Sequence, residues 1–141
     1  MGMLRGEFRY TLDEKGRVVL PPPFRRELGP TVIVTRGFDH CIWVYSKKGW
    51  AGVERVLRGL PLRERDFQRF LFAAARDVEV DRQGRITLPE TLREYAAIDR
   101  EVVVTGMGTR LEIWSEARWK EVVTRIQRQA VEIAEKIDVS L

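Results

Sequence analysis

Residues 13–25 read DEKGRVVLPPPFR, and residues 81–93 read DRQGRITLPETLR. The second stretch begins 68 residues after the first, and six of the thirteen positions are identical. About one identity would be expected between unrelated segments of this length. The shared residues form the motif Asp-x-x-Gly-Arg, followed by Leu-Pro and by a second Arg. The chain therefore repeats a basic surface turn together with an apolar pattern.

The residues around each motif predict strands. Phe8, Tyr10 and Leu12 alternate with polar residues before the first motif, and Val78 and Val80 do so before the second. An alternation of period two indicates a strand with one buried face. Asp hydrogen-bonds to its own downstream backbone and Gly adopts positive φ, so Asp-x-x-Gly predicts a β-hairpin in each copy.

Helices are expected after the strands. The segments 21–28 and 89–95 each begin with Pro, which is favoured in a first helical turn. Ser46 and Ser115 are suitable N-caps for two longer helices, one running to about residue 58 and one almost to the C-terminus. The last helix carries an apolar stripe: Trp119, Val122, Val123, Ile126, Ala130, Ile133 and Ile137. Residues 62–76 predict an amphipathic helix between the copies.

The domain organisation follows from the repeat. We expect a first copy over residues 3–60, a linking helix over 61–76, and a second copy with the C-terminal helix over 77–141. A half of about 60 residues is marginal alone, so the two halves should share one core. The predicted fold is α+β: two β-barrel-type repeats in one chain, related by pseudo-twofold symmetry and flanked by helices.

Composition limits the function classes. The 141 residues are 44% hydrophobic with a net charge of +4, and no apolar run approaches a membrane span or a secretory signal. Cys41 and His40 are each the only residue of their type, so an intrachain disulfide and a thiolate metal cluster are excluded. We interpret them as structural rather than as a catalytic dyad, and we expect no metal, no cofactor and no enzymatic activity.

The candidate site consists of both turns. Lys15, Arg17, Arg82 and Arg85 supply positive charge, and Asp13, Gly16, Asp81 and Gly84 would shape the backbone. A guanidinium held on a strand suits phosphate oxygens or the O6/N7 edge of guanine, and a β-ribbon fits the major groove. An alternative remains: Asp13 and Arg17, like Asp81 and Arg85, could simply pair across their own turn.

The doubled Asp-x-x-Gly-Arg-x-x-Leu-Pro, with Gly6 ahead of the first copy and Phe24-Arg25 after it, resembles the MraZ family over essentially the whole chain. The resemblance implies two AbrB/SpoVT-like swapped-hairpin domains. It also implies a cytoplasmic, nucleoid-associated transcription regulator, mainly a repressor. Such a regulator binds double-stranded DNA at direct repeats in the promoter of its own division and cell-wall gene cluster. Homo-oligomeric rings, commonly octamers or dodecamers, are implied as well. The DNA-contacting Arg of the family falls on Arg17, with Arg85 as its counterpart.

This chain departs from the family pattern at two places. Gln83 stands where the first turn has Lys15, so the turns need not contact DNA equally, and the first has more basic neighbours. The chain also begins with Met1-Gly2 ahead of the expected start at Met3.

Alternative functions stay open. An AbrB-type antitoxin or other partner-binding regulator is disfavoured by the helical C-terminal pattern. An enzyme acting on phosphorylated substrates would use Arg17 and Arg85 as phosphate clamps, but no P-loop or nucleophile–base set is present. A purely structural ring would bind DNA only non-specifically. For oligomer contacts the candidates are Phe67, Phe70, Trp50 and Trp119, although aromatics at such spacing more often lie in a core.

Overall fold

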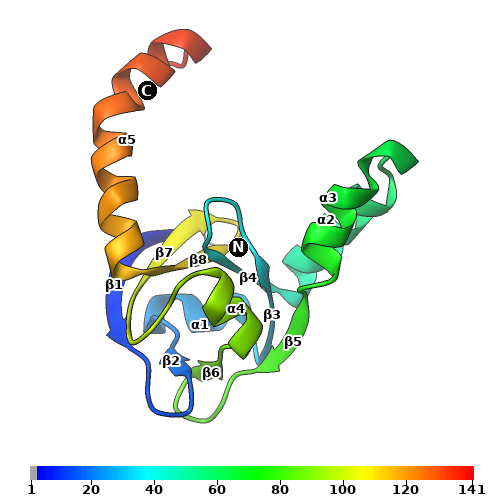
Figure 1. Cartoon of the computed structure of the whole chain (residues 1–141), viewed down its shortest axis with the longest axis vertical. Helices are drawn as coiled ribbons and strands as arrows, with labels where there is room; N and C mark the ends of the chain where they lie inside the picture. The colour runs from blue at the N-terminus through cyan, green and yellow to red at the C-terminus, as the bar shows by residue number, and fades with distance from the viewer. Residues whose placement is uncertain (1–2) are drawn as a thin grey trace.

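The computed structural model describes residues 3–141 as a six-stranded antiparallel sheet, a two-stranded ribbon and flanking helices (Figure 1). The order in the sheet is β1 (Leu4–Thr11), β7 (Glu101–Gly108), β8 (Leu111–Ser115), β4 (Ile42–Ser46), β3 (Thr31–Arg36), β5 (Arg76–Glu79). The ribbon contains β2 (Arg17–Val19) and β6 (Arg85–Thr87). Met1-Gly2, the pair ahead of the expected start, lies outside the described residues. The predicted α+β class is confirmed.

Four of the six strand pairs join the two copies, whereas β3–β4 and β7–β8 pair within one copy. β1 of the first copy pairs with β7 of the second, from Leu4 opposite Gly108 to Thr11 opposite Glu101. β5 pairs with β3, and β2 pairs with β6. The predicted hairpins are therefore wrong in one respect. Each Asp-x-x-Gly turn forms, but the strands on its two sides pair with the other copy, because neither half alone supplies partners for its strand edges. The swapped-hairpin description stays an expectation from the family resemblance.

The ribbon joins the two edges of the large sheet. β1 and β5 are the edge strands, and each leads through its turn into one ribbon strand. The amide of Leu20 donates to the carbonyl of Gly84 at 2.8 Å, and the amide of Leu88 donates to that of Gly16 at 2.9 Å. The two bonds are equivalent under the repeat, and exchanging the two copies reverses the strand order of the large sheet, so the β structure has pseudo-twofold symmetry.

The helices lie close to their predicted positions. α1 (Pro22–Leu28) and α4 (Glu90–Tyr95) follow the ribbon strands. α2 (Lys47–Arg58) and α5 (Glu116–Ile137) begin after capping serines, whose hydroxyls accept hydrogen bonds from backbone amides at 3.0 and 3.1 Å. The helix expected over residues 62–76 is too long. A 3₁₀ turn (Leu62–Glu64) precedes α3 (Arg65–Phe72), and Arg76 pairs with Val34 in the sheet instead of continuing the helix.

Apolar side chains fill both faces of the large sheet. One core lies among the sheet, the ribbon, α1 and α4, and it contains Val18, Leu20, Phe24, Ile86, Leu88 and Leu92. The other lies under α2, α3 and the base of α5, and it contains Trp43, Trp50, Leu57, Leu71, Trp114 and Val122. Both faces are covered, so β3, β4 and β8 are buried along almost their whole length.

The aromatic residues considered for oligomer contacts are mostly intrachain. Trp50 is only 6% exposed, and Phe70 and Trp119 pack against the same core. The indole Nε1 of Trp119 donates to Glu7 Oε1 at 2.8 Å. Phe67 remains 37% exposed.

The outer part of α5 extends away from the body (Figure 1). Val122, near its base, is buried, whereas Ile126, Ile133 and Ile137 are 44, 49 and 61% exposed. The apolar stripe predicted for this helix therefore runs from the core into solvent.

Replacement of Gly106 should test the pairing of β1 with β7. A Cβ at Gly106 would overlap the backbone of Leu4 and Arg5, which cannot move without breaking the ladder. We expect Gly106→Ala to lower the free energy of unfolding by about 1–3 kcal/mol, measured by urea denaturation. Gly59→Ala is the matched control. Gly59 has an ordinary helical φ of −82° and room for a methyl group, so the control should be neutral or stabilising. Equal stability of the two variants would contradict the close approach of these strands.

Candidate nucleic-acid interface

Asp13 organises the first turn. Its Oδ1 accepts hydrogen bonds from the backbone amides of Lys15 and Arg17, both at 2.9 Å. The amide of Gly16 donates to the carbonyl of Asp13 at 3.0 Å. Gly16 has a φ of +75°, which a residue with a Cβ rarely adopts, so Asp and Gly together define this turn.

The second turn repeats this geometry. Asp81 Oδ1 accepts from the amides of Gln83 and Arg85, both at 2.9 Å, and Gly84 has a φ of +78°. The two turns thus present the same backbone shape, although their exposed side chains differ.

The geometry shared by the two turns also positions the arginine at the end of each turn. Arg17 Nε donates to Asp13 Oδ2 at 2.6 Å, and Arg85 Nε donates to Asp81 Oδ2 at 2.9 Å. The pairing across each turn, considered above as an alternative, is therefore present. It uses Nε and leaves the Nη groups of Arg17 without a partner among residues 3–141. Each arginine side chain as a whole is about one quarter exposed, so the pairing orients a side chain that is only partly buried.

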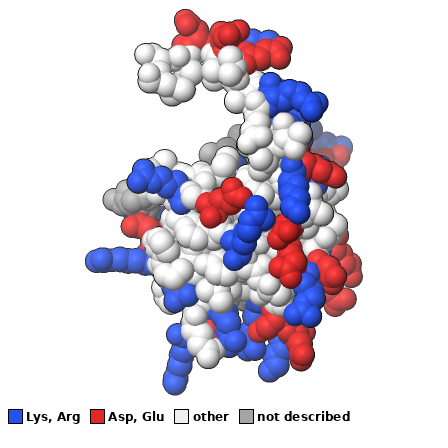
Figure 2. Space-filling view, turned by 90° about the vertical axis from the view of Figure 1, so that its left-hand side faces the viewer, with Lys and Arg blue, Asp and Glu red and all other residues white. Residues whose placement is uncertain are grey.

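The two turns meet in space. Arg85 Nη1 lies 3.8 Å from Asp13 Oδ2, so an arginine of the second copy reaches the carboxylate of the first. Both turns lie at the lower end of the molecule in Figure 1. Figure 2 shows Lys and Arg side chains projecting from this end.

The exposed tips carry different charges. The first tip bears Glu14 and Lys15, which balance, whereas the second bears Arg82 and Gln83. All four residues are exposed. At the tips themselves the second turn is the more basic one, because Glu14 offsets the charge of Lys15. The more basic neighbours expected for the first turn lie outside its tip, and which turn contacts DNA more closely stays a prediction.

Two further arginines brace the turns, and sequence reasoning gave them no role. Arg25 Nε donates to the carbonyl of Leu20 at 3.0 Å, and Arg93 Nε donates to that of Leu88 at 3.1 Å. A Cβ on Gly84 would overlap the guanidinium of Arg25, and a Cβ on Gly16 would come within 3.0 Å of Arg93. Each arginine therefore lies against the turn of the other copy. The identical Arg at the thirteenth position of the motif was the available signal.

The turn carboxylates are held ionised. The pKa of Asp13 is lowered, first by the hydrogen bond from the backbone amide of Arg17 and further by the Arg17 side chain and the Lys15 amide. The pKa of Asp81 is lowered by the equivalent bonds from Arg85 and Gln83.

Cys41 and His40 do not form a reactive pair. The Cys41 thiol is buried and donates to the carbonyl of Phe38 at 3.3 Å, and burial raises its pKa well above the ordinary value. His40 is exposed, and its Nδ1 lies 3.2 Å from the carbonyl of Tyr95.

No group of three or more His, Cys, Asp or Glu side chains in residues 3–141 is placed to hold a metal ion. No helix in the described part of the chain has the length and apolar character required to cross a membrane.

Comparison with known proteins gives one family. The family model described as "MraZ protein, putative antitoxin-like" matches residues 3–71 and again residues 71–138. A protein named transcriptional regulator MraZ from Moorella thermoacetica is 49% identical over 138 residues, which cover 96% of both chains. Proteins of the same name from Carboxydothermus hydrogenoformans and Limosilactobacillus reuteri are 47 and 46% identical. The former match covers 96% of both chains, and the latter covers 97% of this chain and 99% of the relative.

The pH dependence of stability should report the turn carboxylates. Folding lowers the pKa of Asp13 and Asp81, so each stabilises the folded state above its ordinary pKa of 3.8 and loses that contribution as pH falls below it. We expect the Asp13→Asn/Asp81→Asn variant to melt below wild type at pH 7 and to show a smaller loss of Tm between pH 6 and pH 3. Thermal melts followed by circular dichroism measure both. Asp99→Asn, at an exposed position outside the turns, should follow wild type. Parallel profiles for wild type and the double variant would contradict the role given to these bonds.

Proposed function

Because this chain belongs to the MraZ family, we propose that it is a transcriptional regulator that binds double-stranded DNA through its two Asp-x-x-Gly-Arg turns, without enzymatic activity. The observation that carries the proposal is the juxtaposition of the turns. They share one backbone geometry, they approach within ion-pair distance of each other, and they place Lys15 and Arg82 at exposed tips. The names of the relatives support regulation of transcription.

We propose two kinds of contact with DNA, one to phosphates and one to base edges. Lys15 and Arg82 are exposed point charges at the tips, and we assign them to phosphate oxygens, which set affinity and its salt dependence. Arg17 and Arg85 are held through Nε by Asp13 and Asp81, and Arg85 also reaches Asp13 with Nη1 at 3.8 Å. We assign these two forks to base edges, because a guanidinium fixed in one plane suits the O6 and N7 atoms of guanine.

The proposed targets are short direct repeats in the promoter of the protein's own division and cell-wall gene cluster. There the bound protein would mainly repress, working in the cytoplasm on nucleoid DNA. One pair of turns makes few contacts, so useful affinity requires several copies on successive repeats. A homo-oligomeric ring, octamer or dodecamer, meets this requirement by presenting many pairs of turns on one rim.

An antitoxin-like, partner-binding regulator is the second candidate. The description of the matching family model favours it. Such a protein would use the turns for DNA and another face for its partner, so the DNA-binding proposal holds for both. The phosphate-clamp enzyme has no such support.

Specific recognition can be tested on the DNA upstream of the gene. We expect this duplex to bind about 10³-fold or more tightly than a scrambled duplex of equal length. Affinity for both should fall steeply between 50 and 200 mM salt. Fluorescence anisotropy at the two salt concentrations measures both properties. Equal affinity for the two duplexes would refute sequence-specific regulation.

The tip assignment can be tested by matched charge removal. We expect Lys15→Ala/Arg82→Ala to weaken binding to both duplexes and to reduce the slope of log affinity against log salt by about two, one for each lost phosphate contact. Arg17→Ala/Arg85→Ala should instead reduce the preference for the specific duplex. Arg58→Ala/Arg63→Ala removes the same charge from exposed positions near the α2–α3 connection, far from the turns. This control should retain the wild-type slope. A tip variant that keeps the wild-type slope would contradict the assignment.

A further inference from the structure

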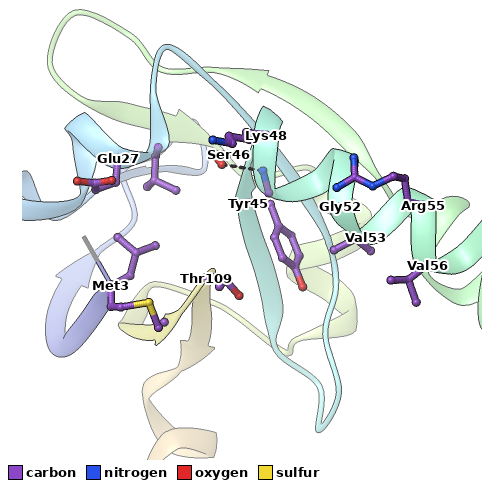
Figure 3. Close-up of a pocket in the computed structure, with 14 residues that line it drawn as sticks. Met3, Glu27, Tyr45, Ser46, Lys48, Gly52, Val53, Arg55, Val56 and Thr109 are labelled. Carbon is purple, nitrogen blue, oxygen red and sulfur yellow. Dashed lines mark hydrogen bonds between the residues drawn. The ribbon is translucent and has the colours of Figure 1, made fainter. Parts of the chain in front are cut away.

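Residues 3–141 leave an apolar groove uncovered beside Met3 (Figure 3). The groove has a volume of about 430 Å³ and lies among the start of β1, the end of α1 and one side of α2. Its apolar lining is formed by Met3, Leu4, Leu28, Tyr45, Val53 and Val56. Met3 and Val56 are 71 and 65% exposed, so the groove opens to solvent with apolar side chains at its mouth.

The outer half of α5 is an apolar ridge that no other element of the described residues covers. Ile126, Ala130, Ile133 and Ile137 follow one another at spacings of four, three and four residues, which places them on one side of a helix. All four are exposed. At 3.6 residues per turn the charged residues Arg128, Glu132 and Glu135 fall on the opposite side. The ridge can therefore enter an apolar site without burying these charges.

From these two surfaces we propose that α5 of one copy docks into the α1–α2 groove of the next copy, which makes a head-to-tail joint. This inference rests on the homo-oligomer of the proposed function and specifies how its copies meet. A helix with apolar residues at such spacings is a known ligand for an apolar groove of this kind. The helix projects away from its own body (Figure 1). Its ridge is therefore accessible to a neighbouring copy.

The sequence of the ridge favours the groove over pairing between two α5 helices. The 4-3-4 spacing matches a coiled-coil seam, but it spans less than two heptads and includes Ala130. Stable coiled coils usually sustain the pattern for at least three heptads. A groove that covers the ridge from several sides buries more apolar surface for the same short length.

The proposed joint is asymmetric, since each copy offers a helix at one end and a groove at the other. Such heterologous contacts generate closed rings when the rotation between copies closes, and filaments when it does not. The joint uses neither turn, so all the turns of an assembly stay available to DNA.

Two exposed substitutions test the two sides of the joint. Ile133→Asp places a charge on the ridge, and Val56→Asp places one at the groove, each at a position about half or more exposed in the protomer. We expect each variant alone to be monomeric, with self-association weakened about a hundredfold or more, because the joint would bury an unpaired carboxylate. Val131→Asp, on α5 off the ridge, and Leu62→Asp, outside the groove, are matched controls at 69 and 77% exposure. Both controls should assemble like wild type in sedimentation velocity.

Mixing the two variants gives the decisive readout. Ile133→Asp keeps an intact groove and Val56→Asp keeps an intact helix, so an equimolar mixture should form a one-to-one dimer with a single working joint. A monomeric mixture would overturn the joint. Association that is lost with Ile133→Asp but retained with Val56→Asp would also overturn it, in favour of contact between two α5 helices. If both variants still form oligomers, the proposed joint is wrong, but the proposed homo-oligomer is not affected. Monomeric wild-type protein would overturn the proposed oligomer as well.

Discussion

The pairing of each copy's strands with the other copy is the constraint on which the rest of the structure depends. β1 finds its partner in β7, β5 in β3, and β2 in β6, so neither half has a complete sheet of its own. The same exchange draws the two turns together, because each turn connects an edge of the large sheet to the ribbon. The site is therefore assembled from both copies of the repeat, and each copy contributes one turn.

The pairing between the two copies also explains how each turn is held in one shape. Each is fixed from within by its Asp and from outside by an arginine of the other copy, Arg93 on Gly16 and Arg25 on Gly84. A DNA-binding element built in this way loses little conformational entropy on binding, since its shape exists beforehand. The cost is that a side chain at Gly16 or Gly84 would be strained at its positive φ and would crowd the bracing arginine.

Much of this was predictable from local sequence. The repeat, the strands, the capped helices and the residues of both turns follow from short-range patterns such as Asp-x-x-Gly, Pro-led helices and Ser N-caps. The partners of the strands did not follow, because alternation identifies a strand without identifying its neighbour. The contact of Arg25 with Gly84 depends on that long-range pairing, and so it was missed. The end of the linking helix was misplaced because Ala73–Ala75 suit a helix, while the sheet edge at Val34 recruits Arg76.

The central claim is that both turns of one chain touch the same DNA. Glu14→Cys and Gln83→Cys place a thiol on each exposed tip, and the native Cys41 is buried, so a photoactivatable cross-linker can be attached at one tip alone. With the upstream duplex, both variants should cross-link efficiently, while Leu62→Cys, far from the turns, should not. Cross-linking from only one tip, or equally from Leu62→Cys, would contradict the account.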